Sequence, residues 1–405
     1  MKLTRIALAG ALSIAAGGAH AACSFENDVP VTSLSAGFQA WKAVTSEMAE
    51  CGNFEAALDQ EFRKKQAQAF AAKPSLYEIG GVANSTIQPL LSQDLIRPLD
   101  DLVAKYGNHL KPNQLIRSGG EIVAIAMMVN DQHLMYRADI FEDLGLAVPE
   151  TWEEVLAAAE EIEAAGVVDY PLGVTMKTGW NLGEEFINMY LGMGGEFFGA
   201  GNRPAVNNDR GVAALEMMKR IIEYADPEYL VSDSTYVQQQ FQQGKIAMAN
   251  LWASRGSAMN NPEESEVVGL VKSAAAPKPT ADAPRPASSL WWDGFVIAKN
   301  ISDEKAEAAF RVALEGIDRE MVEANNDVAV WLVDGYQPTD MAKGAIATAE
   351  AGAAPYPASP QMGLMHTSLG NNLAAYFTGE ATADEALASV EQAYLNGATE
   401  AGLVE

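Results

Sequence analysis

Four of the seven tryptophans lie next to polar side chains, in a pattern typical of a site for a polyhydroxylated molecule. Aromatic rings stack against the apolar C–H faces of such molecules. Their hydroxyl groups need amide, carboxylate or guanidinium partners, because a buried polar group without a hydrogen bond is costly. A place in the hydrophobic core is the alternative for each ring. The tryptophans and their polar neighbours are Trp180 with Asn181, Trp252 with Arg255, and Trp291 and Trp292 with Asp293.

The sequence lacks the motifs that mark common catalytic and cofactor sites. A G-x-S-x-G elbow, a P-loop, an HExxH pair and a CxxC pair are all missing. Residues 192–195 resemble a glycine-rich phosphate turn, but Phe197 stands where the third glycine belongs. The isolated histidines His109, His133 and His366 do not have the spacing of metal ligands. We therefore expect no catalytic residue, no metal and no cofactor.

The charge of the chain excludes two classes of partner. The 405 residues carry 27 basic and 54 acidic side chains, which gives a formal net charge of −27. Binding to nucleic acid or to an anionic membrane needs clustered lysine and arginine, so we expect neither. The length is sufficient for two or more domains, and the hydrophobic fraction of 48% is typical of a globular protein.

The N-terminus has the pattern of a secretory signal peptide. Lys2 and Arg5 precede a short apolar run at residues 6–16, and small residues follow up to Ala22. The run is too short to anchor a protein in a bilayer. We expect residues 1–22 to be removed after export.

The chain has two cysteines, Cys23 and Cys51. Because exported proteins fold in an oxidising compartment, the sequence predicts a disulfide between them. Closing a loop of about 28 residues contributes about 3–4 kcal/mol in the chain-entropy model. Lipidation of Cys23 is the alternative, but His20 stands where that signal has a leucine-like residue.

Strand patterns alternate with amphipathic helix patterns along the chain, which predicts an α/β fold. The clearest helix begins at Thr151, whose capping box includes Glu154, and ends at Gly166. The expected strands are residues 29–34, 75–79, 121–129, 246–251 and 295–298; the expected helices include residues 39–48, 54–70 and 88–93.

Several segments resemble family 1 extracellular solute-binding proteins of bacterial ABC importers, the maltose-binding-protein-like carbohydrate type. Residues 136–146 read YRADIFEDLGL and residues 148–154 read VPETWEE, similar to the stretch with which that family leaves its first lobe. Further similarities lie in LSQDLIRPLDD at residues 91–101, FQQGKIAM at 241–248 and WDGFVI at 292–297. Together these segments extend over most of the chain after residue 22.

The resemblance implies a two-lobed periplasmic-binding-protein fold of type II, with hinge strands and a ligand cleft between the lobes. Lobe one would comprise residues 23–131 plus 290–330, and lobe two residues 132–289 plus 331–405. The implied function is capture of a small carbohydrate or polyol by a periplasmic monomer, which delivers it to an ABC permease in the inner membrane.

Transferred position by position, the resemblance implies a set of ligand-binding residues at strand ends and adjoining loops. Asp131-Gln132-His133 and the aromatic pair near residue 40 depart from the family pattern, which leaves the ligand open. The implied residues are Phe38, Trp41, Asn84, Ser85, Asn130, Gln132, Trp180, Asn181, Trp252, Arg255, Trp291, Trp292, Asp293, Tyr336 and Gln337.

Two other functions stay open. A receptor of the same fold could bind a polyamine or an osmolyte in an aromatic cage. A secreted carbohydrate-active enzyme is the other alternative, since fold does not fix function. For the receptor, we expect Trp292→Ala to abolish binding and to leave the stability of the empty protein nearly unchanged.

Overall fold

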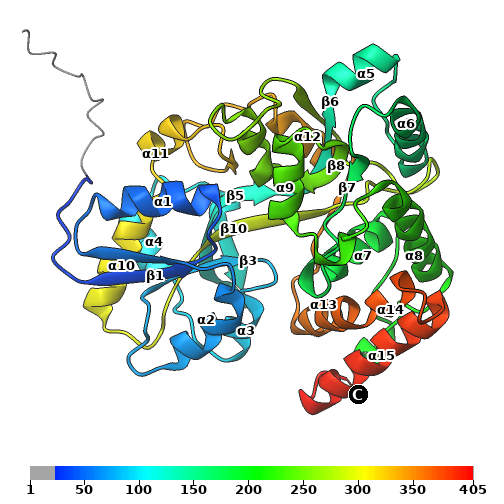
Figure 1. Cartoon of the computed structure of the whole chain (residues 1–405). Coiled ribbons are helices and arrows are strands. Elements are labelled where there is room, and N and C mark those ends of the chain that lie inside the picture. The colour runs from blue at the N-terminus through cyan, green and yellow to red at the C-terminus, as the bar shows by residue number, and fades with distance from the viewer. Residues whose placement is uncertain (1–22, 405) are drawn as a thin grey trace, which may run out of the picture.

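The computed structural model describes residues 23–404, which form two α/β lobes side by side, each built around one sheet (Figure 1). The expected signal peptide, residues 1–22, lies outside the described residues. The first sheet has eight strands: β1 (Val31–Ser35), β2 (Phe54–Leu58), β3 (Ile79–Ala83), β4 (Leu115–Ser118), β5 (Glu121–Asn130), β10 (Ser289–Ile297), β11 (Val330–Trp331) and β12 (Ala354–Pro355). The second has four: β6 (Gln132–Arg137), β7 (Tyr170–Gly173), β8 (Ile246–Trp252) and β9 (Val271–Ala274).

Helices cover both faces of the first sheet. Phe295 and Ile297 of β10 belong to one buried cluster, and Val296 between them belongs to another. This is the alternation expected of a strand that is buried on both sides. The helices of this lobe are α1 (Gln39–Ala49), α2 (Phe62–Ala71), α3 (Gln88–Ser92), α4 (Asp100–Tyr106), α10 (Asp303–Glu315) and α11 (Arg319–Ala324).

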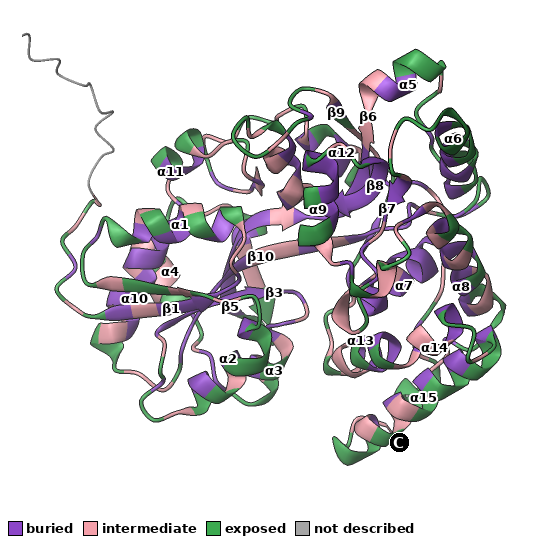
Figure 2. Ribbon diagram, viewed as in Figure 1, coloured by how far each residue is buried: buried purple, intermediate pink, exposed green. Residues whose placement is uncertain are grey.

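The second lobe packs its helices around a smaller sheet and a large shared core. The strand β8 is buried along its whole length, and buried residues concentrate on the central strands of both lobes (Figure 2). The helices are α5 (Ala138–Leu144), α6 (Trp152–Ala165), α7 (Trp180–Gly192), α8 (Asp209–Ile221), α9 (Ser234–Gln242), α12 (Ala342–Glu350), α13 (Pro360–Asn372), α14 (Ala374–Phe377) and α15 (Ala383–Glu400). None of the described helices is long and apolar enough to cross a membrane.

Two extended segments connect the lobes. The strand β5 of the first sheet continues through Asp131 directly into β6 of the second sheet. The strand β10 pairs with β3 and β5 in the first lobe, while Ser289 at its start is hydrogen-bonded to α7 of the second lobe. These crossing strands have the arrangement of a hinge. The residue bounds of the lobes given above stay a prediction.

The capping box of α6 is present as predicted. The Thr151 hydroxyl accepts a hydrogen bond from the Glu154 amide at 3.2 Å, and the Glu154 carboxylate accepts one from the Thr151 amide at 3.2 Å. Gly166 ends the helix in the left-handed region at φ 63°, where glycine has no steric penalty.

The single helix predicted for residues 54–70 is wrong. Its first part is the strand β2, which pairs in parallel with β1, so that Val31 lies opposite Phe54. The helix α2 begins only at Phe62, after a turn at Asp59. Pairing with a neighbouring strand decided this segment, and that is information a local pattern does not carry. The strand expected at residues 75–79 likewise lies four residues later, as β3.

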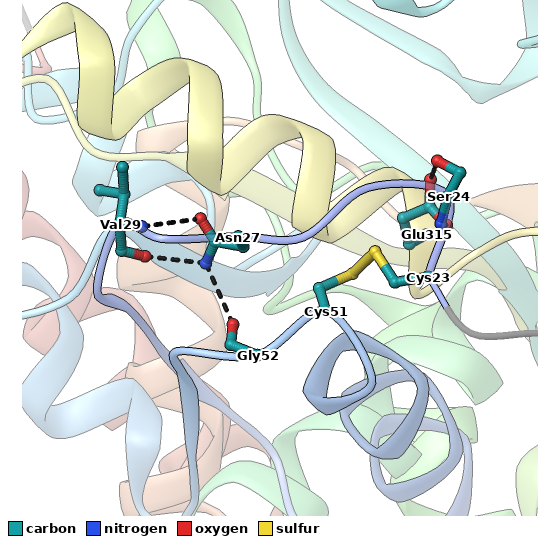
Figure 3. Close-up of a disulfide and its surroundings, with 7 residues drawn as sticks. All are labelled: Cys23, Ser24, Asn27, Val29, Cys51, Gly52 and Glu315. Atoms are coloured by element: carbon teal, nitrogen blue, oxygen red, sulfur yellow. Dashed lines mark hydrogen bonds between the residues drawn. A yellow bond between two sulfur atoms is a disulfide. The ribbon is translucent and has the colours of Figure 1, made fainter.

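The predicted disulfide is confirmed. Cys23 and Cys51 are bonded, with their Cα atoms 4.9 Å apart, and the bond ties the start of the described chain to the end of α1 (Figure 3). Beside it, the Asn27 side-chain amide donates hydrogen bonds to the carbonyls of Val29 at 2.8 Å and Gly52 at 3.1 Å. The N-terminal segment is therefore held by covalent and polar contacts.

Candidate ligand-binding site

A cavity of about 550 Å³ lies between the two lobes and is open to solvent on one side. Residues of the first lobe, of the second lobe and of the crossing strand β10 all contribute to its lining. The lining comprises Ala36, Phe38, Gln60, Glu61, Phe62, Arg63, Lys64, Ala83, Asn130, Lys177, Thr178, Gly179, Trp180, Asn181, Asp233, Ser234, Thr235, Trp252, Ser254, Arg255, Trp291, Asp293 and Asn371.

Strand ends and helix starts position these side chains. The strands β3, β5 and β8 end at Ala83, Asn130 and Trp252, all of which line the cavity. Ligands in α/β proteins bind outside the carboxyl ends of strands, as here. The helices α7 and α9 begin at the cavity with Trp180 and Ser234.

Three tryptophans form one side of the cavity, which we call the aromatic wall: Trp180, Trp252 and Trp291. Their ring centroids lie 5.7–6.2 Å apart. The Trp291 indole N–H donates hydrogen bonds to Glu184 at 3.0 Å and to Ser289 at 2.9 Å. The wall is therefore packed and oriented before any ligand arrives.

A buried histidine fixes Trp180. The His366 ring stacks on the Trp180 ring with centroids 5.0 Å apart. Burial lowers the pKa of His366 to about 4, so the ring is neutral at pH 7. Its Nε2 then donates to the Trp180 carbonyl at 2.8 Å, and its Nδ1 accepts from the Tyr356 hydroxyl at 2.8 Å.

Two carboxyl groups beside the aromatic wall have raised pKa values. Burial raises the pKa of Glu184 to about 8, so this carboxyl is mostly protonated at pH 7. Burial raises the pKa of Asp293 to about 7, and the positive charge of Arg63 opposes that rise. Asp293 lines the cavity, and its carboxyl group has no hydrogen-bond partner among residues 23–404. It can accept from a ligand when ionised or donate to one when protonated.

The first lobe supplies a second feature, which we call the charged wall: Glu61, Arg63 and Lys64. Lys64 forms an ion pair with Glu61. The Arg63 guanidinium reaches across the cleft and lies 4.7 Å from the centroid of the Trp180 ring, on the opposite lobe. This cation–π contact joins the two walls.

The second lobe adds two more cations. Lys177 forms an ion pair with Asp233 at 3.2 Å. Arg255 donates hydrogen bonds to the hydroxyl of Ser234 at 3.0 Å and to the side-chain carbonyl of Gln238 at 3.3 Å. Both contacts hold their side chains at the cavity.

The structure brings together part of the residue set expected from the sequence. These residues line the cavity from both lobes and from β10, and their side chains combine aromatic faces with charged and amide groups. They are Phe38, Asn130, Trp180, Asn181, Trp252, Arg255, Trp291 and Asp293.

Three expected residues lie outside the cavity lining and make contacts within the protein. Trp41 is 1% exposed in the core of the first lobe, where its ring approaches Gly81 so closely that a Cβ there would lie 2.8 Å from it. The Asn84 side chain accepts from the Trp292 amide at 2.9 Å and donates to the Leu290 carbonyl at 3.2 Å, which fixes β10. Gln132 is buried and donates to Glu185 at 2.7 Å.

Four others lie outside the cavity lining. Trp292 is half-buried against a core cluster of the first lobe, because neighbours on a strand point to opposite faces and Trp291 faces the cavity. Ser85 is half-buried away from the lining. Tyr336 packs against the first-lobe core. Gln337 is exposed, and its backbone carbonyl and amide are hydrogen-bonded to the Asn326 side chain.

Sequence reasoning missed five of the charged residues that line the cavity: Glu61, Arg63, Lys64, Lys177 and Asp233. Arg63 lay inside a longer predicted helix, so its place in the first turn of α2, beside the cavity, was hidden. Lys177 and Asp233 had no aromatic neighbour to draw attention to them. The available signal for Asp233 was its role as an N-cap, since its carboxylate accepts from the amides of Thr235 and Tyr236.

One group of described residues has the spacing of metal ligands, Cys23, Cys51 and Glu315. Its two sulfurs are bonded to each other, so neither is available as a thiolate ligand.

Two lobes, crossing strands and a lined cleft define the class of hinged solute receptors. The profile of the bacterial extracellular solute-binding proteins matches residues 53–315. The chain belongs to this family, and is therefore a binding protein and not an enzyme.

Curated relatives align over short stretches. The multiple sugar-binding protein of Streptococcus mutans is 33% identical over 84 residues, which is 21% of this chain and 18% of that protein. A probable amino-acid ABC transporter periplasmic-binding protein of Sinorhizobium fredii is 20% identical over 159 residues, or 37% of this chain and 36% of that protein. The alignments thus span well under two thirds of these relatives.

Solved structures are similar over nearly the whole chain. An ABC transporter solute-binding protein of Agrobacterium radiobacter in complex with ribitol has a TM-score of 0.79 at 22% identity, covering 92% of this chain and 99% of its own. One from Agrobacterium vitis with bound D-mannitol has a TM-score of 0.77 at 20% identity, with the same coverage. These similarities confirm the predicted two-lobed fold.

Proposed function

We propose that this chain is the periplasmic substrate-binding component of an ABC importer and that it binds a small polyol or sugar between its lobes. The aromatic wall beside the unpartnered Asp293 is the observation that carries the proposal. Ribitol and D-mannitol are the ligands of two similar structures. The maltose-bound protein of T. maritima is similar as well, with a TM-score of 0.73.

The cavity suits such a solute in size and chemistry. A volume of about 550 Å³ lies within the range of about 300–1,000 Å³ typical of small-molecule sites. The tryptophan faces would stack on C–H groups, while Asp293, Asn181 and Arg63 would exchange hydrogen bonds with hydroxyls. These groups support the binding of a polyhydroxylated molecule in this cavity.

Transport would follow from closure of the cleft. Ligand between the walls would favour the closed form, because only there do both lobes contact it. The hinge would be the β5–β6 segment and β10. We propose that the closed monomer delivers its ligand to an inner-membrane permease, after export directed by residues 1–22.

The charges of the cavity disfavour the polyamine alternative. Lys64 and Lys177 are paired with carboxylates, which leaves Asp293 as the one lining carboxylate outside an ion pair in the described part of the chain. A polycation needs several such groups, and the unpaired Arg63 and Arg255 would repel it.

A thermal-shift screen of the mature protein, residues 23–405, tests this function. The panel would hold pentitols, hexitols, aldoses, ketoses, maltose, sugar acids, amino acids and polyamines. A ligand at 100 times its dissociation constant raises the free energy of unfolding by about 2.7 kcal/mol. Stabilisation by polyols or sugars, or by their acids, is expected. Stabilisation by amino acids or polyamines alone would overturn the proposal.

A further inference from the structure

Two arginines at the cavity lack an acidic partner. The lining holds four cationic side chains, Arg63, Lys64, Lys177 and Arg255, against the carboxylates of Glu61, Asp233 and Asp293. Each lysine is in an ion pair, whereas neither arginine has a carboxylate within 4.0 Å among residues 23–404. The cavity lining therefore has more cationic than anionic side chains, whereas the chain as a whole carries a net charge of −27.

Arg63 is the more available of the two. Its guanidinium makes no hydrogen bond within the described residues, so all five of its N–H groups are free. The guanidinium lies over the ring faces of Trp180 at 4.7 Å and Phe62 at 5.1 Å, and it interacts with the Asp293 carboxyl only at longer range. Aromatic stacking holds the plane of a guanidinium and leaves its edge open, and that edge matches the two oxygens of a carboxylate.

The second arginine keeps the potential positive. Arg255 donates two hydrogen bonds to neutral partners, the Ser234 hydroxyl and the Gln238 side chain. A charge surrounded by protein is costly unless an opposite charge compensates it, and the Asp233 carboxylate that acts on Arg255 from a distance is already paired with Lys177. An anionic ligand would supply the compensation.

We infer that the natural ligand is a sugar acid, an aldonate or uronate whose carboxylate binds the edge of the Arg63 guanidinium. This inference rests on the proposed function and narrows it from polyols and sugars to their acids. The hydroxyl-bearing carbons would lie along the aromatic wall, and the acid group would lie at the charged wall. Asp293 would form hydrogen bonds with the hydroxyl groups of the ligand.

Isothermal titration calorimetry with matched pairs tests the inference at pH 7.5 and low salt. The pairs are ribitol with ribonate, mannitol with mannonate, and galactose with galacturonate. The acid of at least one pair should bind about 30-fold or more tightly than its neutral partner, the contribution of a charged bidentate hydrogen bond. Tighter binding of the neutral member in every pair would overturn the inference and leave the proposed function standing. Binding of no member would overturn both.

Variants assign the acid group to Arg63. Arg63→Gln should remove the preference for the acid, with a loss of affinity at least about tenfold greater for the acid than for the neutral partner. Lys65→Gln is the matched control, because it removes a cation on the same helix that lies outside the cavity lining and is paired with Asp59, and it should keep the preference. Loss of the preference in Arg255→Gln but not in Arg63→Gln would overturn the assignment. The exposed Arg63 side chain makes its removal harmless to folding, which thermal unfolding of the empty variant checks.

Discussion

The aromatic wall and the charged wall face each other across one cavity but are built differently. Trp252 and Trp291 are 7% and 5% exposed, and buried hydrogen bonds orient Trp291. Arg63 and Lys64 are exposed; Arg63 is held by contacts with the Phe62 and Trp180 rings, and Lys64 by its ion pair with Glu61. The shape of the cavity is therefore fixed by side chains packed in the core of the second lobe, whereas part of its charge comes from exposed side chains of the first lobe.

The largest expected effect comes from the disulfide between Cys23 and Cys51 in the first lobe. Cys51→Ser should lower the free energy of unfolding by about 3–4 kcal/mol, because the closed loop of 28 residues restricts the unfolded chain. Urea denaturation of the mature protein, with Cys23→Ser as a second variant, measures this. Ligand affinity should stay within about twofold, because the bond is remote from the lining. A large loss of affinity would show that the charged wall depends on the N-terminal segment.

Two tryptophan variants separate wall from core. Trp180→Ala should weaken ligand binding by about 100-fold or more, because it removes a central platform of the aromatic wall. Trp292→Ala is its control: affinity should change by less than about fivefold, while stability falls by about 2–3 kcal/mol through lost core packing. Titration calorimetry and urea denaturation measure both. If Trp292→Ala abolished binding at unchanged stability, the cavity assignment of these two rings would be wrong.

A buried acid gives the aromatic wall a pH signature. Because the pKa of Glu184 is raised by burial to about 8 from 4.5, the folded state holds a proton that the unfolded state releases. Stability from this group is fully present below pH 4.5 and is lost as pH rises through about 8. Glu184→Gln should therefore lose less stability than the parent protein between pH 5 and pH 8.

The control for that experiment has the opposite sign. The hydrogen bond from Arg220 lowers the pKa of Glu153 below 4.5, so its contribution is present above about pH 4.5 and is lost as the pH falls. Glu153→Gln should therefore lower stability slightly and by a constant amount between pH 5 and pH 8, without changing the slope there. Urea denaturation across pH 4–9 compares both variants with the parent. Parallel curves for Glu184→Gln and the parent would contradict the buried, protonated state.

The smallest expected effect lies between the walls. Burial raises the pKa of Asp293 to about 7, so this carboxyl gains a negative charge as pH rises from 6 to 8. Affinity for a sugar acid should fall over that range by up to about tenfold, through repulsion between like charges. In Asp293→Asn the pH dependence should disappear. Calorimetry at three pH values measures the affinity of both proteins. The same pH dependence of affinity in Asp293→Asn and in the parent would show that Asp293 does not act on the ligand.

The sequence predicted the aromatic wall better than the charged wall. Trp180, Trp252 and Trp291 stood out because they lie at element ends beside polar residues. Trp291 and Trp292 were both expected at the ligand, but neighbours on a strand point to opposite faces. Which of the two faces the cavity depends on the pairing of β10 with β3 and β5. Trp41 of α1 could not be placed, since its burial depends on Gly81, forty residues away on the strand β3.

Arg63 shows the limit most clearly. Its role requires that residues 54–58 leave the helix pattern to join a sheet, and that α2 begin next to the other lobe. Neither condition is local. The fold followed from family-like segments spread along the chain, but the contact between lobes depends on their relative placement.

The position of Trp180 gives the protein an optical reporter of its own. The indole contacts a neutral imidazole and a guanidinium, and two further indoles lie within 6.2 Å. A solute that enters the cleft and draws Arg63 toward its acid group changes both the polarity and the quenching around this ring. Occupancy should therefore be readable from the emission of the unlabelled protein, without a dye or an added chromophore.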